Sequence, residues 1–169
     1  MKKIIICFAI IIASFSGFIL PAQALLREHH QSPEVLIYHA QHSIKDRQQR
    51  AWQIILFPET NKSSPTKYYL RLVGFPGLVD FNHPQPLEII TSTGSILMAN
   101  DVYAKKNPAI NVGQYDMTEI INELPNKGSI KLICPASNSS NIKKNSSAIA
   151  LSISASILTE WQWLHEQYN

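Results

Sequence analysis

The chain of 169 residues is the size of one domain, and it carries 15 Lys and Arg against 12 Asp and Glu. No segment has the dense basic patch on which binding to a phosphate backbone relies, so the sequence argues against nucleic acid as a partner. The sequence pI of 8.9 owes part of its basic value to Lys2 and Lys3.

The first 24 residues predict a secretory signal peptide. Lys2 and Lys3 precede an apolar run from Ile4 to Leu20, and small residues fill the −3 and −1 positions of a cleavage site after Ala24. A bilayer span needs roughly 20 residues. The apolar run from Ile4 to Leu20 is only slightly shorter, so an uncleaved membrane anchor is the alternative. Cleavage leaves residues 25–169 as a single domain. Before cleavage, we expect the signal peptide to be the protein's only contact with the membrane.

Short alternating segments separated by turn signals predict a series of strands. These are residues 35–44, 51–57, 68–73, 86–91, 95–98, 129–134 and 148–154. Polar residues 45–50 and Ser92–Gly94 predict two hairpin connections. We expect residues 25–33 to be loose, residues 61–67 to form a loop, and the low-complexity stretch 137–147 to be a mobile polar loop.

Two segments have helical periodicity. Residues 116–124 carry an apolar stripe that starts at Met117, with Asp116 as the expected cap and Pro125 as the stop. In residues 157–168, the stripe from Ile157 to Tyr168 favours a helix, with a strand as the alternative. The whole pattern predicts a mainly β, single-domain antiparallel β-sandwich or partly open barrel, with one short helix at about 116–124 and a C-terminal helix.

Six motifs stand in a distinctive order and spacing: Trp52–Phe57, Leu70–Gly77, His83–Leu87, Asp101–Val102, Asn111–Asp116 and Glu160–Trp161. Together, over about residues 26–164, they resemble a family of exported cyanobacterial proteins known as a domain of unknown function (number 3122). The resemblance implies a cyanobacterial source and export to the periplasm or the thylakoid lumen. It implies no activity, cofactor or catalytic residue. The polar insert at 137–147 departs from the family pattern.

Signals for catalysis and metal binding are weak. The chain has no Gly-x-Ser-x-Gly nucleophile elbow. His39 and His42 lie three apart, on opposite faces of a strand, so they cannot chelate one metal ion together. Cys134 shares the strand face of Ile130 and Leu132, which predicts a buried thiol. We therefore expect no metal site, no cofactor and no catalytic residue, and the sequence favours a non-catalytic protein over an enzyme.

Five polar residues remain as candidates for ligand binding. Arg71 alternates with apolar neighbours, so its guanidinium needs a carboxylate partner in a structural ion pair, or else it serves an anion-binding site. The stretch GFPGLVDFNHPQP at 74–86 has turn chemistry at its glycines and prolines. That leaves Asp80, Asn82 and His83 without a structural role. The full candidate set is Arg71, Asp80, Asn82, His83 and Asp101.

The function that these observations favour is an exported, non-catalytic β domain that binds a protein or a small ligand as an accessory factor. A hydrolase with a site assembled from dispersed polar residues is one alternative, and a cluster of His83, Asp101 and Arg71 in a cleft would support it. The other alternative is a barrel that carries an apolar ligand such as a pigment or lipid.

Overall fold

The computed structural model describes residues 26–32, 35–61, 63–103, 109–139 and 148–168, with side chains from residue 37 onward. The predicted signal peptide and most of the predicted mobile loop lie outside these ranges. No helix in the described ranges is both long enough and apolar enough to cross a membrane.

The described chain is mainly β, with one α-helix at the C-terminus, as the sequence predicts. The strands are β1 Leu26–Ser32, β2 Val35–Lys45, β3 Ala51–Asn61, β4 Ser64–Val73, β5 Val79–Phe81, β6 Leu87–Thr91, β7 Ile96–Asp101, β8 Val112–Asp116, β9 Ile130–Cys134, β10 Ala136–Asn138 and β11 Ile149–Ile153. The helix α2 spans Ala155–Glu166, and a single 3₁₀ turn, η1, spans Ile121–Glu123.

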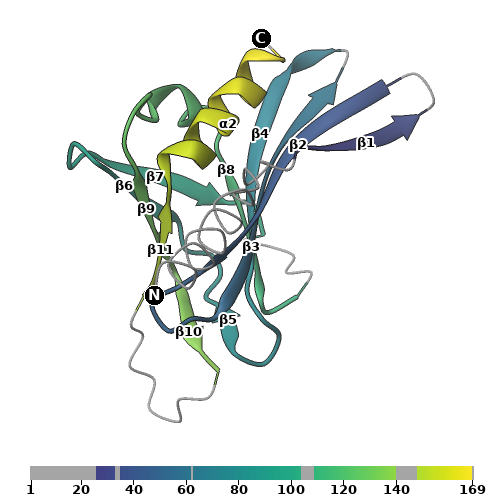
Figure 1. The fold of residues 1–169 in the computed structure, drawn as a ribbon. Coiled ribbons are helices and arrows are strands. Elements are labelled where there is room, and N and C mark those ends of the chain that lie inside the picture. The colour runs from purple at the N-terminus through teal and green to yellow at the C-terminus, as the bar shows by residue number, and fades with distance from the viewer. Residues whose placement is uncertain (1–25, 33–34, 62, 104–108, 140–147, 169) are drawn as a thin grey trace, which may run out of the picture.

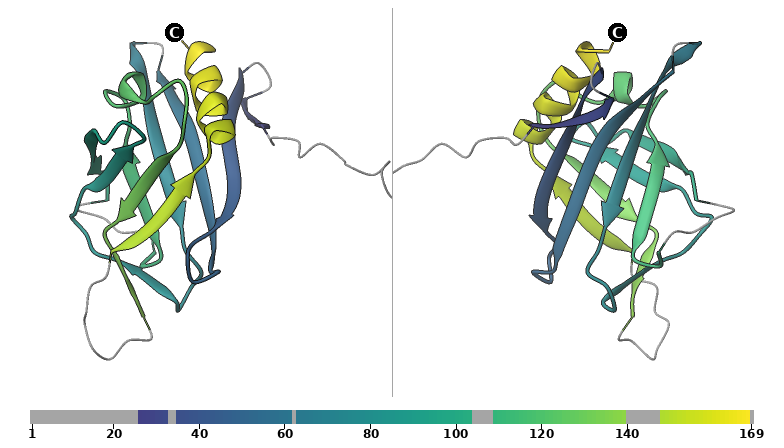
Figure 2. Two further views of the ribbon diagram at one scale, coloured as in Figure 1. Left: turned by 60° about the vertical axis from the view of Figure 1, so that its left-hand side comes forward. Right: turned by 90° about the vertical axis from the view of Figure 1, so that its right-hand side faces the viewer.

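Nine strands form one sheet in the order β1-β2-β3-β4-β8-β7-β6-β9-β11, and β10 pairs with β5. The pairs are antiparallel throughout. The sheet bends so that β2, β3, β4 and β8 form one half and β6, β7, β9 and β11 the other (Figures 1 and 2). In the described residues no pairing joins β1 to β11, so the barrel stays open, and α2 lies between the two halves (Figure 1).

Alternation along each strand decides which side chains enter the core. In β4, Tyr68, Leu70 and Leu72 are buried, whereas the residues between them are half-buried on the outer face. The inward residues of both halves pack in one cluster with Trp161 and Leu164 of α2. This packed cluster fills the space between the halves, which argues against the barrel that encloses an apolar ligand.

The predicted helix at 116–124 is wrong in type, although its apolar stripe is buried as expected. Asp116 is the last residue of β8, and the N–H of Met117 donates to the carbonyl of Tyr68 on β4 at 2.8 Å. This hydrogen bond extends the pairing of β8 with β4 by one residue, so a helix does not begin at Asp116. The chain then leaves β8 through turns, and Ile121–Glu123 forms the 3₁₀ turn.

Three segments expected to lack regular structure contain strands. Residues 26–32 form β1 because they pair with β2. The hairpin of β3 and β4 continues through most of the expected loop, with Asn61 opposite Ser64. Ser137 and Asn138 belong to β10, which pairs with β5. In each case pairing with a neighbouring strand outweighs weak local propensity. The predicted hairpins at 45–50 and 92–94 are confirmed, and so is the C-terminal helix.

Candidate functional site

Arg71 lies at the centre of the outer face made by β3, β4 and β8. It stands opposite Ile55 on β3 and opposite Gln114 on β8. Its neighbours Leu70 and Leu72 point into the core and are fully buried. Since side chains alternate along a strand, the Arg71 side chain must emerge on the outer face.

Neutral groups hold the guanidinium of Arg71. Its Nε and Nη2 both donate to Oε1 of Gln114, at 3.0 and 2.7 Å, and its Cζ lies 5.1 Å from the centre of the Phe57 ring. Among the described residues, none of the three ion pairs within 4.0 Å includes Arg71. The expected carboxylate partner is therefore replaced by an amide and an aromatic ring, and a half-buried positive charge stays without a direct counter-ion.

A chain of hydrogen bonds leads from Arg71 to His83. The hydroxyl of Tyr103 donates to the same Oε1 of Gln114 at 2.8 Å, and the backbone N–H of Tyr103 donates to Oδ1 of Asp101 at 2.9 Å. Oδ2 of Asp101 lies 2.5 Å from Nδ1 of His83. The structure thus brings three of the five candidates, Arg71, His83 and Asp101, into one network.

The pair of His83 and Asp101 is closed to solvent. The two side chains are 9% and 3% exposed, and Phe81 stacks on the imidazole at 6.1 Å between ring centroids. Nε2 of His83 is buried and makes no hydrogen bond with any of the described residues. A general base must reach the proton that it abstracts. In this arrangement Nε2 is buried, and the pair fastens the segment after β5 to the end of β7.

The two remaining candidates lie elsewhere. Oδ1 of Asp80 accepts a hydrogen bond from the hydroxyl of Ser139 at 2.6 Å. The backbone N–H of Asn82 donates to the carbonyl of Pro135 at 2.8 Å. Both contacts hold β5 against the segment that contains β10, so these residues serve the pairing of the small sheet.

Gln114, Tyr103 and Phe57 are site residues that sequence reasoning missed. Gln114 is only 7% exposed, yet a glutamine in an alternating strand looks like an ordinary surface residue. Its signal is its place within the motif Asn111–Asp116. Tyr103 follows directly after the motif Asp101–Val102.

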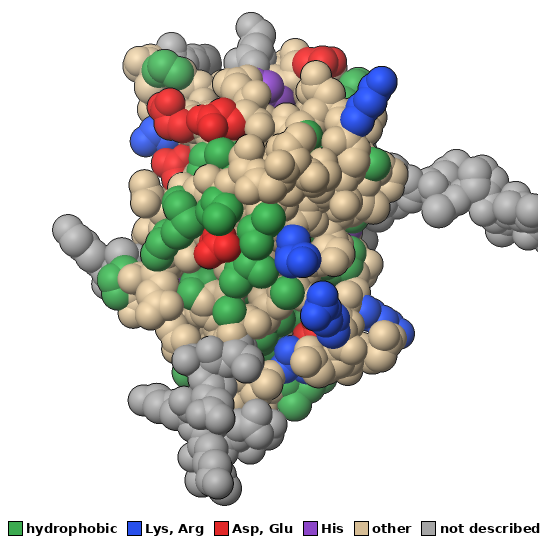
Figure 3. Space-filling model, turned by 90° about the vertical axis from the view of Figure 1, so that its left-hand side faces the viewer, with side chains coloured by type: hydrophobic (Ala, Val, Ile, Leu, Met, Phe, Trp, Pro, Cys, Tyr) green, Lys and Arg blue, Asp and Glu red, His purple; other side chains and the backbone are tan. Residues whose placement is uncertain are grey.

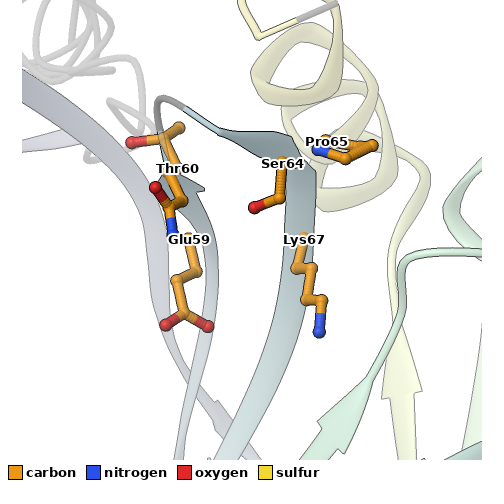
Figure 4. Close-up of a pocket in the computed structure, with 6 residues that line it drawn as sticks. Glu59, Thr60, Ser64, Pro65 and Lys67 are labelled. Carbon is orange, nitrogen blue, oxygen red and sulfur yellow. The ribbon is translucent and has the colours of Figure 1, made fainter.

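Two hollows lie along β3 and β4, one on either side of the position of Arg71, which lines neither of them. One, of about 330 Å³, is lined by Ser43, Ala51, Trp52, Gln53, Val73, Gly74, Phe75 and Pro76. The other, of about 420 Å³, lies at the end of the β3–β4 hairpin, where Glu59 and Lys67 extend the same way from facing strands (Figure 4). Gln53 and Val73, which line the first hollow, stand opposite each other on β3 and β4. Val73 is two residues along β4 from Arg71, a distance of roughly 7 Å along the strand.

In the part of the chain that the structure describes, no three His, Cys, Asp or Glu side chains lie close enough together to hold a metal ion.

The comparisons with known proteins give one match. The model of the family described as "Protein of unknown function (DUF3122)" matches residues 24–164. The chain belongs to this family. No curated protein and no solved structure matches the chain. The matched range contains every strand that the structure describes and the whole network from Arg71 to His83. The family description names no activity, so it assigns no role to these residues.

Proposed function

We propose that this DUF3122 protein is an exported, non-catalytic domain that binds a small organic anion on the outer face of β3, β4 and β8. The observation that carries the proposal is the guanidinium of Arg71, which is half-buried and held in place without a direct counter-ion. Half-buried positive charge is costly unless an anion compensates it. A bound carboxylate or phosphate supplies that compensation.

The guanidinium is also oriented for this purpose. The N–H of Nε and one N–H of Nη2 donate to Gln114. The second N–H of Nη2 and an N–H of Nη1 form the other edge of the guanidinium, which makes no hydrogen bond to the described residues. Two parallel N–H groups on that edge match the two oxygens of a carboxylate or phosphate. Gln114 is itself fixed by the Tyr103 hydroxyl, so the fork is pre-positioned before the anion arrives.

The adjacent hollow favours an anion with an apolar body. Ala51, Val73, Phe75 and Pro76 contribute to its wall, and Phe75 is 59% exposed. Contacts with such side chains give affinity through buried apolar area. The ligand class is therefore an organic acid that carries an apolar or aromatic group.

A binding titration tests this function. Wild-type protein, labelled with ¹⁵N, is titrated with sodium benzoate and separately with inorganic phosphate while the amide signals of β3, β4 and β8 are followed. We expect saturable shifts with benzoate, weaker ones with phosphate, and loss of both in Arg71→Met. Arg47→Met removes an exposed arginine from the β2–β3 turn and should leave binding intact. Absence of saturable shifts in the wild type with either anion would reject the proposal.

Export is the second part of the proposal, and it rests on the signal-peptide pattern of residues 1–24. We expect the mature protein to begin at Leu25 and to reside in the periplasm or, in a cyanobacterial host, the thylakoid lumen. Amino-terminal sequencing of protein from the fractionated host checks this. A full-length product retained in the cytoplasm contradicts it.

A hydrolase is the second candidate, because a His–Asp pair orients an imidazole as a general base in many hydrolases. The buried Nε2 of His83 places this candidate behind the first. Turnover of p-nitrophenyl esters that is lost in both His83→Gln and Asp101→Asn would reverse the order.

A further inference from the structure

The outer face of the other half of the sheet carries an apolar surface that we call the β6 patch. It consists of Ile90 and Glu88 on β6, Ile96 and Met98 on β7, and Ile133 and Lys131 on β9. Ile96 is 60% and Met98 50% exposed. Figure 3 shows this face, with hydrophobic side chains gathered around a single acidic group and basic groups close by.

The register explains why these side chains form one surface. Ile90 stands opposite Ile96 on one side and opposite Lys131 on the other, and Glu88 stands opposite Met98 and Ile133 in the same way. The intervening residues Leu87 and Ile89 are fully buried. The outer face of an antiparallel sheet is normally polar when it meets water. A contiguous apolar surface at this place therefore marks an interaction site.

The two charges in the β6 patch are opposite in sign and unpaired within one copy. Glu88 and Lys131 occupy diagonal positions on neighbouring strands, yet the ion pairs within 4.0 Å among the described residues do not include them. One acid and one base, side by side among apolar groups, form a surface that is complementary to itself. Charge complementarity of this kind selects a partner that presents the same two charges in reverse order.

We propose that the β6 patch is the interface of a two-fold symmetric homodimer. A two-fold axis lying in the interface, across the midpoint of the line from Glu88 to Lys131, places each Glu88 over the Lys131 of the other copy. The same axis brings the isoleucines and Met98 of both copies together, as in face-to-face sheet packing. The patch lies on the half of the sheet opposite to Arg71, so the dimer leaves the proposed anion site open.

Charge exchange gives a test that distinguishes this dimer from other association. Protein purified from cells that express the full chain is studied by sedimentation equilibrium over a range of concentrations. E88K puts two basic groups, and K131E two acidic groups, on each patch, so each variant alone should associate at least tenfold more weakly than the wild type. An equimolar mixture of E88K and K131E should associate again, because each contact then joins opposite charges. The double variant E88K/K131E should also form the dimer.

Matched controls are E119K and K67E, which reverse exposed charges on residues outside the patch and should leave the association constant unchanged. Thermal unfolding confirms that each variant is folded. Ile96→Ser tests the apolar part and should weaken the dimer while leaving the charge pattern intact. A wild-type protein that remains monomeric at millimolar concentration overturns the proposal. So does a mixture of E88K and K131E that associates no better than either variant alone.

Discussion

Nε2 of His42 on β2 lies 3.1 Å from Oε2 of Glu160 on α2, so a histidine and a carboxylate meet where the C-terminal helix packs on the sheet. Glu160 is 7% exposed. Burial raises the pKa of Glu160 above its ordinary value of 4.5, while His42 acts in the opposite direction. The docking of α2 is therefore linked to the protonation of Glu160.

We expect Glu160→Ala to destabilise the fold by about 3 kcal/mol at pH 7, because it leaves His42 without its partner in a buried place. Urea unfolding measures this change. The variant Thr159→Ala, at the exposed neighbouring position, serves as a control and should cost less than about 1 kcal/mol.

Glu160→Gln should change the pH dependence of stability. A carboxyl whose native pKa is raised binds its proton more tightly in the folded state, so its contribution is complete below pH 4.5 and is lost as pH rises through the native pKa. The free energy of unfolding of the wild type should therefore fall relative to that of Glu160→Gln as pH rises above 4.5. Parallel curves for the two proteins from pH 4 to 7 would contradict a raised pKa.

Asp46 organises the turn between β2 and β3. Its carboxylate accepts hydrogen bonds from the backbone N–H groups of Gln48 and Arg50, from Nε of Arg50 and from Nε1 of Trp52. Burial by itself raises the pKa of Asp46, but the hydrogen bonds from Trp52 and Arg50 outweigh it and the net pKa is lowered.

We expect Asp46→Asn to lower the free energy of unfolding by about 2 kcal/mol at pH 7, because charge-assisted hydrogen bonds are lost. The stability from a lowered pKa is present above the ordinary value of 3.8 and disappears as pH falls through the native pKa. Urea unfolding at pH 7 and pH 3 should show the difference between the two proteins shrinking in acid.

Gly113 on β8 allows a close approach in the core. A Cβ at this position would lie 2.7 Å from Cε1 of Phe81 and 2.8 Å from Oη of Tyr115. Gly113→Ala should therefore destabilise the fold by about 2 kcal/mol through overpacking, as measured by thermal unfolding. Gly77→Ala is a useful comparison, since its φ is +77° but no atom lies within 4 Å. It should cost about 1 kcal/mol, from backbone strain alone.

Gln114→Glu tests the anion site without removing Arg71. The new carboxylate would neutralise the guanidinium in place of a ligand, so binding of benzoate should be lost while the protein remains folded. Isothermal titration calorimetry measures the binding, and urea unfolding the stability. Full binding in this variant would show that the anion does not approach Arg71.

Local patterns were enough to predict most strands, because alternation depends only on which residues face the core. The hairpins at 45–50 and 92–94 followed from turn chemistry. His83 and Asp101 could be named as candidates from their segments, but the sequence did not predict that the two side chains meet. The partner of Arg71 was beyond sequence reasoning, since Gln114 lies 43 positions away. A carboxylate was the expected partner on electrostatic grounds, and only the pairing of β4 with β8 placed an amide there.

The sequence by itself determined the strand periodicity, the turns and the set of side chains that enter the core. It also identified GFPGLVDFNHPQP as a turn region that contains a few polar residues with no structural role evident from the sequence. The tertiary structure decided the order of the strands, with β8 between β4 and β7, and so decided which polar groups meet. It joined Arg71 to Gln114, and it brought Glu160 to His42. Such contacts depend on the packing of the whole sheet and helix, because segments distant in the chain become neighbours only after the shared core has formed.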